Sequence, residues 1–527
     1  MTQRIPPHQK DQKFHNWGQN INAVPEIIWE PETLDDLIYI VKEANVKKRR
    51  IRAVGDGHSW SPLWWRGRAP DGWIVKSSKI NHVKVHEDLT KLTVGCGASI
   101  EQLMKAEIKH RVCIPTSVVL TAVLLGGVVS TGSHGTGYNQ PIIGDYVHSI
   151  TMVMWDGTVK VLSKEDGEVF EAAKCSLGSF GLIYEITFNV VPQPVVHVQD
   201  KKLKISEVFD RADPSKIKEL VLNNDYVEIF WFPLNKQGEL WVKLFNYAPG
   251  KEPHNTPCEA VGNLMGWAQA QYAKWVALVE GKIHPSAVTK FSTEFQALLD
   301  SQDTYQDLSW AMHFQPELEV FPPTDDTEVA FKIDSNFSNV VEAFLGIIEL
   351  TERYAANGKY PLNLVLECRF LKNTQQLLSP GYEPEGSDVH HCYLEIESYA
   401  NTQHYNEFAR DCFIPWFTKH PSWKALPHWP KNWQVLNDPG QSFSIDRYLR
   451  ATYGENLVKF AQIRDKIDPH RIFLNNTLED LLYPDEVEEL TAFHSELSSD
   501  IKEIEQRLKA IQTEKVQLAQ QVANSHS

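Results

Sequence analysis

The sequence predicts an α+β fold made of several domains. The chain has 527 residues, enough for two or three domains with large hydrophobic cores. Its first part alternates strand-like and helix-like segments, and residues 196–420 mix further strands with helices. Hydrophobic residues at 42% and charged residues at 23% are typical of an ordinary globular protein.

The chain opens with a predicted strand, helix and strand. Ala23–Ile28 is largely apolar, and Ile51–Val54 alternates again as a strand. Between them Thr33 is a suitable N-cap for an amphipathic helix. The apolar positions at helical spacing are Leu34, Leu37, Ile38, Val41 and Ala44. Residues 1–13 are polar, with paired prolines, and predict an unstructured arm.

Several strands and one short helix follow. Residues 73–98 alternate apolar and polar side chains, and Ile100–His110 reads as a helix. Residues 142–161 and 181–191 supply further strands, with a hairpin turn signal at Asp156–Gly157. This alternation ends near Pro192, so we place the first domain boundary at residue 195.

The rest of the chain has a mixed block and a distinct end. Residues 227–234 and 238–247 read as strands, and residues 338–356 as a helix. The tail, residues 483–527, predicts a coiled-coil-like helix of about three heptads. Its apolar a and d positions are Ile501, Ile504, Leu508, Ile511, Leu518 and Val522. Two interpretations stay open, a helix packed on its own domain and a contact that forms a homo-oligomer.

Composition limits the partners and the compartment. The net charge of −16 argues against a nucleic acid or an anionic membrane as partner, because binding phosphates needs an excess of lysine and arginine. Seven scattered cysteines without a C-x-x-C pair fit a reducing compartment. No apolar run of about 20 residues predicts a membrane span, and the polar N-terminus does not resemble a secretory signal. We therefore expect a cytoplasmic protein, without a metal site, since no metal-ligand spacing stands out.

Two glycine-rich stretches suggest a bound cofactor. Ile51–Leu63 leads from a strand into a Gly-Asp-Gly turn with His58 at its exit, and Gly126–Gly137 is a loop rich in glycine, serine and threonine. Such loops let backbone N–H groups converge on a phosphate. The residues alone leave this interpretation open beside two ordinary glycine turns. A dinucleotide fold of the G-x-G-x-x-G type and a G-x-S-x-G hydrolase have no matching motif.

Two charges interrupt an apolar strand later in the chain. Glu367 and Arg369 are two residues apart in NLVLECRFL, so both side chains lie on one face of the strand and Cys368 lies on the other. Buried charges are costly unless they pair or bind a ligand. A structural ion pair and a ligand site both remain open.

The two glycine-rich stretches together resemble a known family. Val54–Ser59 (VGDGHS) and Ser117–Gly137 (SVVLTAVLLGGVVSTGSHGTG) are similar to the flavin-binding segments of the vanillyl-alcohol-oxidase superfamily, whose FAD domain is called PCMH-type. The most similar branch contains the sugar-1,4-lactone oxidases, such as gulonolactone and arabinonolactone oxidases, and the alditol oxidases. Further landmarks occur in the family's order at Asn16–Gly18, Ser176–Phe188, Pro427–Lys431 and Asp468–Asn475.

The resemblance implies a domain plan and a set of functional residues. It implies a two-subdomain FAD-binding domain at 14–195, a cap domain for the substrate at 196–420, a segment returning to the FAD domain at 421–482 and the helical tail at 483–527. The FAD-binding residues that it implies are Val54, Gly55, Asp56, Gly57, His58, Ser59, Ser117, Val119, Gly127, Thr131, Gly132, Ser133, His134, Ile183 and Lys431. The catalytic residues that it implies are Glu367, Arg369 and Lys431.

The family's covalent flavin falls on one histidine. His58 matches the residue that bonds the 8α-methyl carbon of the flavin, and residues 118–125 contain no cysteine for a second link. Lys431 matches the lysine of the family's H-W-G-K segment, although Pro430 stands in place of the usual glycine. A cation near flavin N1 would stabilise the reduced, anionic flavin.

The implied reaction is hydride transfer from a CH–OH group to FAD, followed by reduction of O2 to H2O2. The substrate class is a small sugar-derived alcohol, namely a polyol, a sugar-1,4-lactone or a nucleoside-like molecule. Val118 falls where the family has a small residue that admits oxygen, and Val119 falls on the family's serine near the substrate. A dehydrogenase that uses a quinone, cytochrome or dye therefore stays an alternative. A non-catalytic scaffold is a third, which Glu367, Arg369 and Lys431 argue against.

Overall fold

The structure is a computed structural model that describes residues 4–65, 72–255, 284, 286–298, 303–313, 323–438, 440 and 443–484. The chain forms two compact units, residues 1–475 and 476–527, and helix α14 (Asn476–Leu482) is the described element of the second. The heptad pattern at 501–522 lies outside the described residues, so the coiled-coil tail stays a prediction. Across the described part, no helix is both long and apolar enough to span a membrane.

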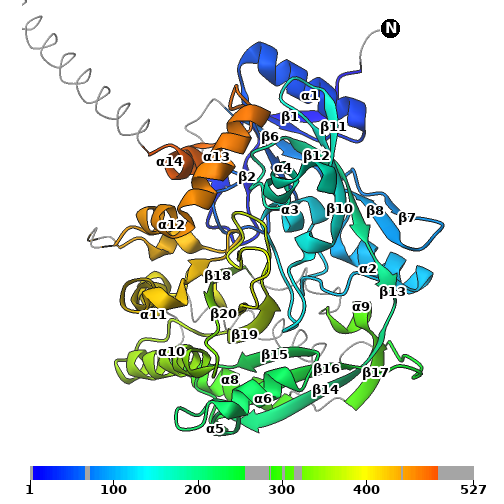
Figure 1. Cartoon of the computed structure of the whole chain (residues 1–527). Helices are drawn as coiled ribbons and strands as arrows, with labels where there is room; N and C mark the ends of the chain where they lie inside the picture. The colour runs from blue at the N-terminus through cyan, green and yellow to red at the C-terminus, as the bar shows by residue number, and fades with distance from the viewer. Residues whose placement is uncertain are drawn as a thin grey trace, which may run out of the picture. The chain divides into compact units, whose positions relative to one another are not determined.

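A four-stranded sheet forms around the N-terminal β-α-β unit, drawn in blue in Figure 1. Helix α1 (Leu34–Lys47) connects β4 (Ile27–Trp29) to β5 (Arg50–Val54), and both of these strands pair parallel with β6 (Gly72–Lys76). Thr33 caps the helix by accepting a hydrogen bond from the Asp36 N–H, as predicted. The sheet order is β1 (His8–Lys10), β4 (Ile27–Trp29), β6 (Gly72–Lys76) and β5 (Arg50–Val54).

The prediction of an unstructured arm at residues 1–13 is wrong for its middle. Strand β1 pairs antiparallel with β4, from His8 opposite Trp29 to Lys10 opposite Ile27. All three residues of β1 are exposed, so the strand has no apolar side that a sequence pattern could show. Its backbone hydrogen bonds and a few side-chain contacts, such as His8 against Trp29 with ring centroids 4.9 Å apart, place it.

A five-stranded sheet and several short elements complete the N-terminal half. Helix α2 (Ile100–His110) has the bounds that the sequence predicted. The sheet order is β11 (Val159–Ser163), β10 (Val147–Val153), β12 (Leu182–Asn189), β8 (Lys91–Gly95) and β7 (Val83–Val85). The short elements are β2 (Phe14–His15), β3 (Asn22–Ala23), β9 (Val112–Cys113), β13 (Val191–Pro192), α3 (Leu125–Ser130) and α4 (Glu168–Ala173).

The middle of the chain folds around an eight-stranded sheet, seen in green and yellow in Figure 1. Its order is β17 (Asp303–Asp307), β14 (Val195–Lys204), β16 (Glu239–Tyr247), β15 (Tyr226–Trp231), β19 (Val365–Lys372), β20 (His390–Tyr399), β18 (Thr324–Lys332) and β21 (Leu426–Pro427). The described helices that follow in the chain are α5 (Ile205–Val208), α6 (Ser215–Leu222), α8 (Ala287–Leu298), α9 (Leu308–Ala311), α10 (Ser338–Ala356), α11 (Tyr405–Lys419), α12 (Ile445–Tyr453) and α13 (Glu455–Ile467).

This sheet has one apolar face and one polar face. Residues directly opposite each other in antiparallel strands share a face. One buried row across five strands is entirely apolar and consists of Val242, Ile229, Cys368, Leu394 and Val329. Helices cover this face: Phe331 contacts Trp416 of α11, with ring centroids 5.3 Å apart. The neighbouring row, Trp241, Phe230, Glu367, Glu395 and Glu328, lies on the opposite face.

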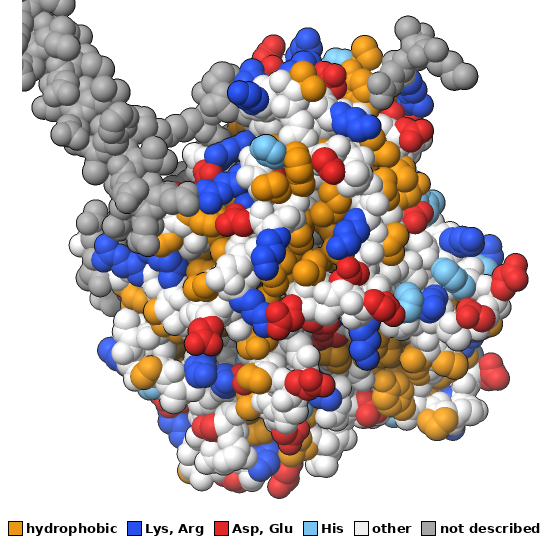
Figure 2. Space-filling view, turned by 45° about the horizontal axis from the view of Figure 1, so that its top comes forward, with side chains coloured by type: hydrophobic (Ala, Val, Ile, Leu, Met, Phe, Trp, Pro, Cys, Tyr) orange, Lys and Arg blue, Asp and Glu red, His pale blue; other side chains and the backbone are white. Residues whose placement is uncertain are grey.

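The space-filling view adds the charge distribution on one side of the molecule. On the face in Figure 2, lysine and arginine side chains are interspersed with aspartate and glutamate, and hydrophobic side chains gather between them. Basic residues form no continuous surface on that face.

One buried guanidinium connects distant segments in the first unit. Arg52 of β5 is 5% exposed and donates hydrogen bonds to four backbone carbonyls, those of Leu63, Leu177, Gly178 and Phe473. Burial lowers the pKa of Arg52 to about 9, which still leaves it charged at neutral pH. The side chain therefore fixes the strand that leads into the first glycine turn.

We expect Arg52→Met to lower the free energy of unfolding by about 3–5 kcal/mol, because four buried carbonyls lose their donors. The urea midpoint of the purified protein measures this loss. Arg49→Met is the matched control, since Arg49 forms a partly exposed ion pair with Glu26 at 2.7 Å, worth about 0–1 kcal/mol. Equal midpoint shifts in the two variants would contradict the role assigned to Arg52.

Candidate active site

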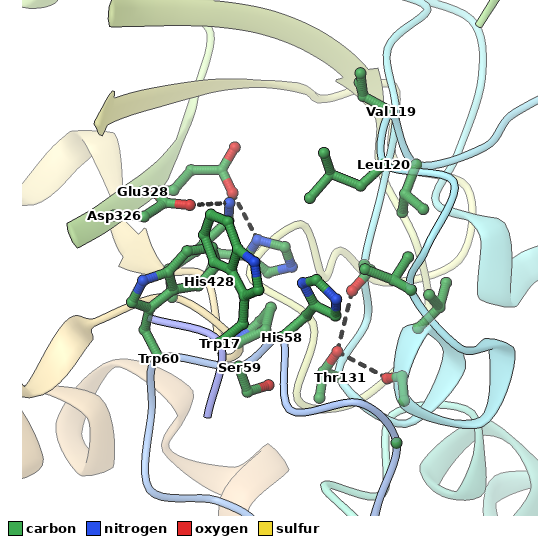
Figure 3. A pocket seen from close by; sticks show the side chains of 18 of the residues that line it. Trp17, His58, Ser59, Trp60, Val119, Leu120, Thr131, Asp326, Glu328 and His428 are labelled. Carbon is green, nitrogen blue, oxygen red and sulfur yellow. Dashed lines mark hydrogen bonds and ion pairs between the residues drawn. The ribbon is translucent and has the colours of Figure 1, made fainter. Parts of the chain in front are cut away.

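A cavity of about 600 Å³ lies between the glycine-rich segments and the polar face of the eight-stranded sheet (Figure 3). Most residues predicted from the sequence line it, and they come from both halves of the first unit. The predicted residues on its wall are Val54, Gly55, Asp56, Gly57, His58, Ser59, Val119, Gly127, Thr131, Ser133, His134, Ile183, Glu367, Arg369 and Lys431. Ser117 and Gly132 do not line it.

The first glycine segment offers unused hydrogen-bond donors. Within the described chain, the backbone N–H groups of residues 55–59 donate no hydrogen bond. Gly57 has a φ of +79°, and an added Cβ would lie 3.1 Å from Asn16 Cα, so a side chain would not fit there. The Asn16 amide in turn donates to the Ser59 carbonyl at 3.0 Å. This loop is held open toward the cavity, as binding a phosphate requires.

The second glycine segment is built differently. Its backbone donors are mostly used inside the segment: the N–H groups of Thr131, Gly132 and Ser133 bond the carbonyls of Gly127, Val129 and Val128. A phosphate contact from this turn would therefore come from hydroxyl groups. The Oγ1 of Thr131 lies 3.0 Å from the Oγ of Ser133, and both residues line the cavity.

The two residues off the cavity wall serve the shape of this segment. Gly132 has a φ of +63°, and an added Cβ would lie 3.2 Å from Cys175 Sγ. The carbonyl of Ser117 lies where a Cβ on Gly135 would stand, at 2.0 Å. Gly127, in contrast, has no atom within 4 Å of an added Cβ and faces the cavity. Its missing side chain leaves room for a ligand.

His58 points into the cavity from the end of the first glycine turn (Figure 3). Its Nδ1 is buried and has no hydrogen-bond partner within the described chain. Burial lowers the pKa of His58, against the opposing charge of Asp56, so the ring is neutral at pH 7. Trp17, which we did not predict, stacks on this ring with centroids 5.7 Å apart and an interplanar angle of 24°. The unpartnered Nδ1 of His58, the open space at Gly127 and the unused N–H donors of residues 55–59 together fit a flavin nucleotide.

Glu367 and Arg369 form a two-point ion pair on the cavity wall. Arg369 Nε donates to Glu367 Oε1 at 2.6 Å, and Nη2 donates to Glu367 Oε2. Arg369 Nη2 also lies 3.9 Å from Glu395 Oε2 on the next strand. The pair is thus structural and also faces the cavity, and binding of a ligand by these two residues stays a prediction.

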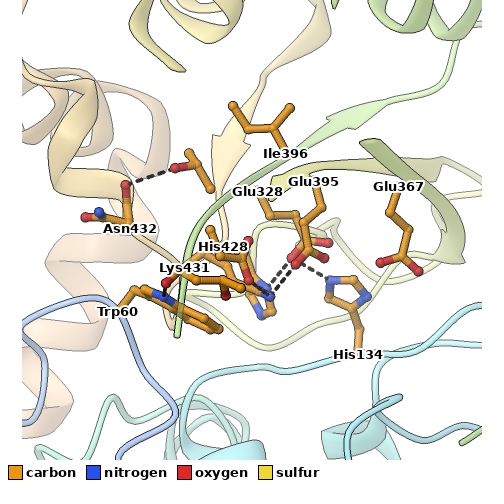
Figure 4. Close-up of polar contacts among 12 residues, drawn as sticks. Trp60, His134, Glu328, Glu367, Glu395, Ile396, His428, Lys431 and Asn432 are labelled. Atoms are coloured by element: carbon orange, nitrogen blue, oxygen red, sulfur yellow. Dashed lines mark hydrogen bonds and ion pairs between the residues drawn. The ribbon is translucent and has the colours of Figure 1, made fainter. Parts of the chain in front are cut away.

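Lys431 lies in the middle of an acidic cluster (Figure 4). Its Nζ donates to Glu395 Oε1 at 2.6 Å and to Asp326 Oδ2, and it lies 5.0 Å from the centre of the Trp60 ring. Burial alone would lower the pKa of Lys431, but Asp326 and Glu395 hold it well above its ordinary value. The amine is therefore permanently protonated. The carbonyl of Pro430 accepts a hydrogen bond from the backbone N–H of Trp60 at 2.7 Å, which joins this segment to the loop after His58.

A buried glutamate connects two histidines beside this cluster (Figure 4). Glu328 Oε2 accepts a hydrogen bond from His428 Nδ1 at 2.6 Å and from His134 Nε2 at 3.3 Å. Burial raises the pKa of Glu328, but both histidines outweigh it and hold the pKa well below the ordinary value. Burial lowers the pKa of His428 to about 4, so its ring is neutral.

This trio also has the composition of a metal site. Its three candidate ligand atoms lie within 4.8 Å of one another. Both imidazoles already donate to one carboxylate oxygen, so a metal would have to displace two hydrogen bonds. The direct contacts account for the arrangement without a metal.

The sequence argument missed Asp326, Glu328, Glu395 and His428. A signal was present, because Asp326 and Glu328, like Glu395 and Glu397, are acidic residues two apart in strand-like segments. That is the spacing that singled out Glu367 and Arg369. His428 stands in the same Pro427–Lys431 segment as the predicted lysine.

Comparisons with known proteins agree with this geometry. Residues 25–163 match the family described as FAD binding domain, and residues 186–481 match the family described as D-arabinono-1,4-lactone oxidase. L-gulonolactone oxidase from Mus musculus is 24% identical over 484 residues, 90% of this chain and 99% of that protein. L-gulono-1,4-lactone dehydrogenase from Mycobacterium tuberculosis is 25% identical over 478 residues, 89% and 99% of the two chains.

The fold has a matching solved structure. A cholesterol oxidase from B. sterolicum superposes with a TM-score of 0.78 at 18% identity, covering 90% of this chain and 97% of the other. The predicted α+β fold with a PCMH-type FAD domain is thereby confirmed. The domain boundaries at 195, 420 and 482 remain predictions. Strand β21, within the segment predicted to return to the FAD domain, pairs with β18 of the eight-stranded sheet.

The acidic wall predicts a pH dependence of stability. Burial, with Glu395 nearby, raises the pKa of Glu397 from 4.5 to about 7. Between these values the folded side chain keeps a proton that the unfolded chain has lost, so the free energy of unfolding falls as pH rises. Glu397→Gln stays neutral in both states and should flatten this fall in urea midpoints measured from pH 4.5 to 7.5.

The exposed Glu385 provides the matched control for this measurement. Glu385→Gln removes a carboxylate of the same kind without burial and should leave the slope unchanged. A Glu397→Gln profile parallel to that of the unsubstituted protein would contradict the assignment.

Proposed function

Because the chain belongs to the D-arabinono-1,4-lactone oxidase family, we propose that it oxidises a CH–OH group of a sugar-1,4-lactone or a related sugar-derived alcohol with O2 as the electron acceptor. The chain carries an FAD-binding domain, and FAD is its cofactor. The proposed substrate class and the proposed electron acceptor are taken from the names of relatives, among them L-gulonolactone oxidase.

One observation carries the proposal. The three predicted catalytic residues, Glu367, Arg369 and Lys431, share a single cavity with both glycine-rich segments. Glu367 and Arg369 lie on β19, whereas Lys431 lies in the loop that follows β21. A cofactor held by those segments and a substrate held by these side chains would therefore meet in one enclosed space. A scaffold protein without catalysis would gain nothing from burying these charges together.

The chain's residues orient the substrate and exclude water. FAD bound by the glycine-rich segments would supply a hydride acceptor for the substrate carbon, with O2 as the proposed final acceptor of the electrons. Arg369, fixed by its two hydrogen bonds to Glu367, and the protonated Lys431 amine are placed to donate hydrogen bonds to substrate oxygens. The apolar side chains of Val118 and Val119 close another part of the wall.

The hydroxyl proton needs an acceptor other than Lys431. The Lys431 amine keeps its own proton, because its pKa is held well above its ordinary value. His428 is neutral, its Nδ1–H is committed to Glu328, and its Nε2 is buried without a partner within the described residues. Since His428 lines the cavity, we assign Nε2 as the atom that takes the proton.

We propose further that the flavin is covalently attached through His58. Its neutral ring and its unpartnered Nδ1 on the cavity wall support the attachment. Stacking on Trp17 restricts the ring to one orientation. A covalent link at this place would fix one end of the flavin beside the first glycine loop.

We expect His58→Ala to release essentially all flavin on acid precipitation, whereas the unsubstituted protein retains it in the pellet. Absorbance of pellet and supernatant, together with the flavin mass on the peptide containing His58, measures the difference. His110→Ala is the matched control, because His110 is exposed at the end of α2. Free flavin from the unsubstituted protein would show that no such bond exists.

A dehydrogenase remains the second candidate for a specific reason. Val118 is 9% exposed on the cavity wall, where the resemblance implies a smaller residue that admits oxygen. One relative, from Mycobacterium tuberculosis, is named as a dehydrogenase. A bulkier side chain at this position would restrict the path of O2 and favour another acceptor.

We also propose that the protein is located in the cytoplasm. The described cysteines, Cys96, Cys113, Cys175, Cys368, Cys392 and Cys412, are buried and free of disulfide bonds. Reduced thiols support a reducing compartment such as the cytoplasm.

The proposed function is tested by turnover with L-gulono-1,4-lactone and D-arabinono-1,4-lactone in air, with H2O2 measured by a coupled peroxidase. We expect Lys431→Met to lower kcat/KM by about 100-fold or more, because it removes a charged donor at the substrate. Lys424→Met, at an exposed lysine of the same segment, should leave the rate unchanged. Turnover that requires an added dye would support the dehydrogenase. Absence of turnover with both O2 and the dye would contradict the proposed oxidation of sugar lactones.

A further inference from the structure

Aromatic side chains line the cavity beyond the ion pairs. Five of them lie on the eight-stranded sheet, directly after its strand β15 or on α8 and are at most 8% exposed, namely Phe230, Phe232, Trp241, Phe291 and Tyr399. They lie far in sequence from the glycine-rich segments that are expected to hold the cofactor. The cavity therefore has a predominantly aromatic part on the side of the sheet.

This aromatic part continues directly from the catalytic residues. Trp241 lies opposite Phe230, and Phe230 lies opposite Glu367, all on the polar face of the sheet. The rings of Phe230 and Trp241 are 5.2 Å apart between centroids. A ligand whose alcohol reaches Glu367 and Arg369 would thus place its next group against these two rings.

A small sugar lactone alone does not match such a wall. Nearly every carbon of that molecule carries an oxygen, and an oxygen buried against aromatic rings loses about 1–3 kcal/mol of hydration without a replacement hydrogen bond. Flat rings with apolar faces match aromatic walls better, because stacked rings bury apolar area and gain favourable electrostatics. The wall favours a ligand with a ring next to its polyol part.

Trp241 supplies an independent observation. Its side chain is 2% exposed, and its Nε1–H is buried without a hydrogen-bond partner within the described chain. Buried indole N–H groups usually have an acceptor. An acceptor atom on the ligand would satisfy this donor.

We propose that these aromatic residues form a subsite for a second ring, so that the preferred substrate is a glycoside: a sugar-derived alcohol joined to a flat ring that carries a hydrogen-bond acceptor. The ring is an aromatic heterocycle, since such a ring is flat, has two apolar faces and carries acceptor atoms. The inference rests on the proposed function and narrows its substrate class.

The test is anaerobic reduction of the enzyme-bound flavin, followed by its absorbance. Methyl β-D-glucoside is compared with phenyl β-D-glucoside and cellobiose, and methyl β-D-riboside with uridine. We expect phenyl β-D-glucoside or uridine to show an apparent second-order rate constant about tenfold or more above its methyl partner. A preference for cellobiose alone would contradict the aromatic ring.

The outcomes separate this inference from the proposed function. If the free lactones reduce the flavin while the methyl compounds equal or exceed their ring-bearing partners, the ring subsite is wrong and the proposed function stands. If neither lactones nor glycosides reduce the flavin, both are overturned.

Variants tie the preference to the aromatic wall. Trp241→Leu should lower the ratio of ring-bearing to methyl rate constants by about tenfold, and Trp241→Phe, which keeps a ring but lacks the N–H, by less. Phe209→Leu is the matched control, because Phe209 stacks on Phe344 at 3.9 Å and does not line the cavity. An unchanged ratio in Trp241→Leu would overturn the subsite.

Discussion

The cost of burying charge is the constraint on which this site depends. One face of the eight-stranded sheet carries several carboxylates from neighbouring strands, and Glu328, Glu367 and Glu395 lie in one row. Each would lose several kcal/mol if it were buried alone. The structure meets this cost by placing Arg369, Lys431 and two histidines among them and by leaving a cavity beside them. The apolar face of the same strands forms the core under α10 and α11, so alternation along each strand assigns stability to one face and chemistry to the other.

The two halves of the first unit contribute different chemistry to the cavity. The N-terminal half offers backbone donors at residues 55–59 and the ring of His58, which suit a nucleotide. The sheet offers charged and aromatic side chains, which suit a polar substrate with an attached ring. Arg52 fixes the strand before the first loop, and the Trp60 N–H bonds the Pro430 carbonyl, so the loop that holds His58 is joined to the segment that carries Lys431.

Much of the fold was accessible from the sequence because it is local. Helix α10 has the predicted bounds, and Thr33 caps α1, since apolar spacing and capping act within a few residues. The cavity residues of the glycine-rich segments were also found by their motifs. What the sequence could not show is strand register: Glu328 meets Glu395, and Trp241 meets Phe230, only through pairing between distant strands. The edge strand β1 was missed for a related reason, because its three side chains are exposed and its pairing with β4 leaves no apolar pattern in the sequence.

The electrostatics of the cavity also divide the roles of its polar groups. A lysine between two carboxyls is an effective hydrogen-bond donor, but the same neighbours prevent it from giving up its proton, so it cannot accept one from the substrate. A neutral histidine whose other nitrogen is committed to a buried carboxylate has the opposite properties. Its free nitrogen is the proposed proton acceptor, and the adjacent negative charge of Glu328 would offset part of the cost that burial places on the resulting cation. Donation by Lys431 and Arg369 and acceptance by His428 would therefore be complementary functions, and both depend on the acidic residues that pair with these groups.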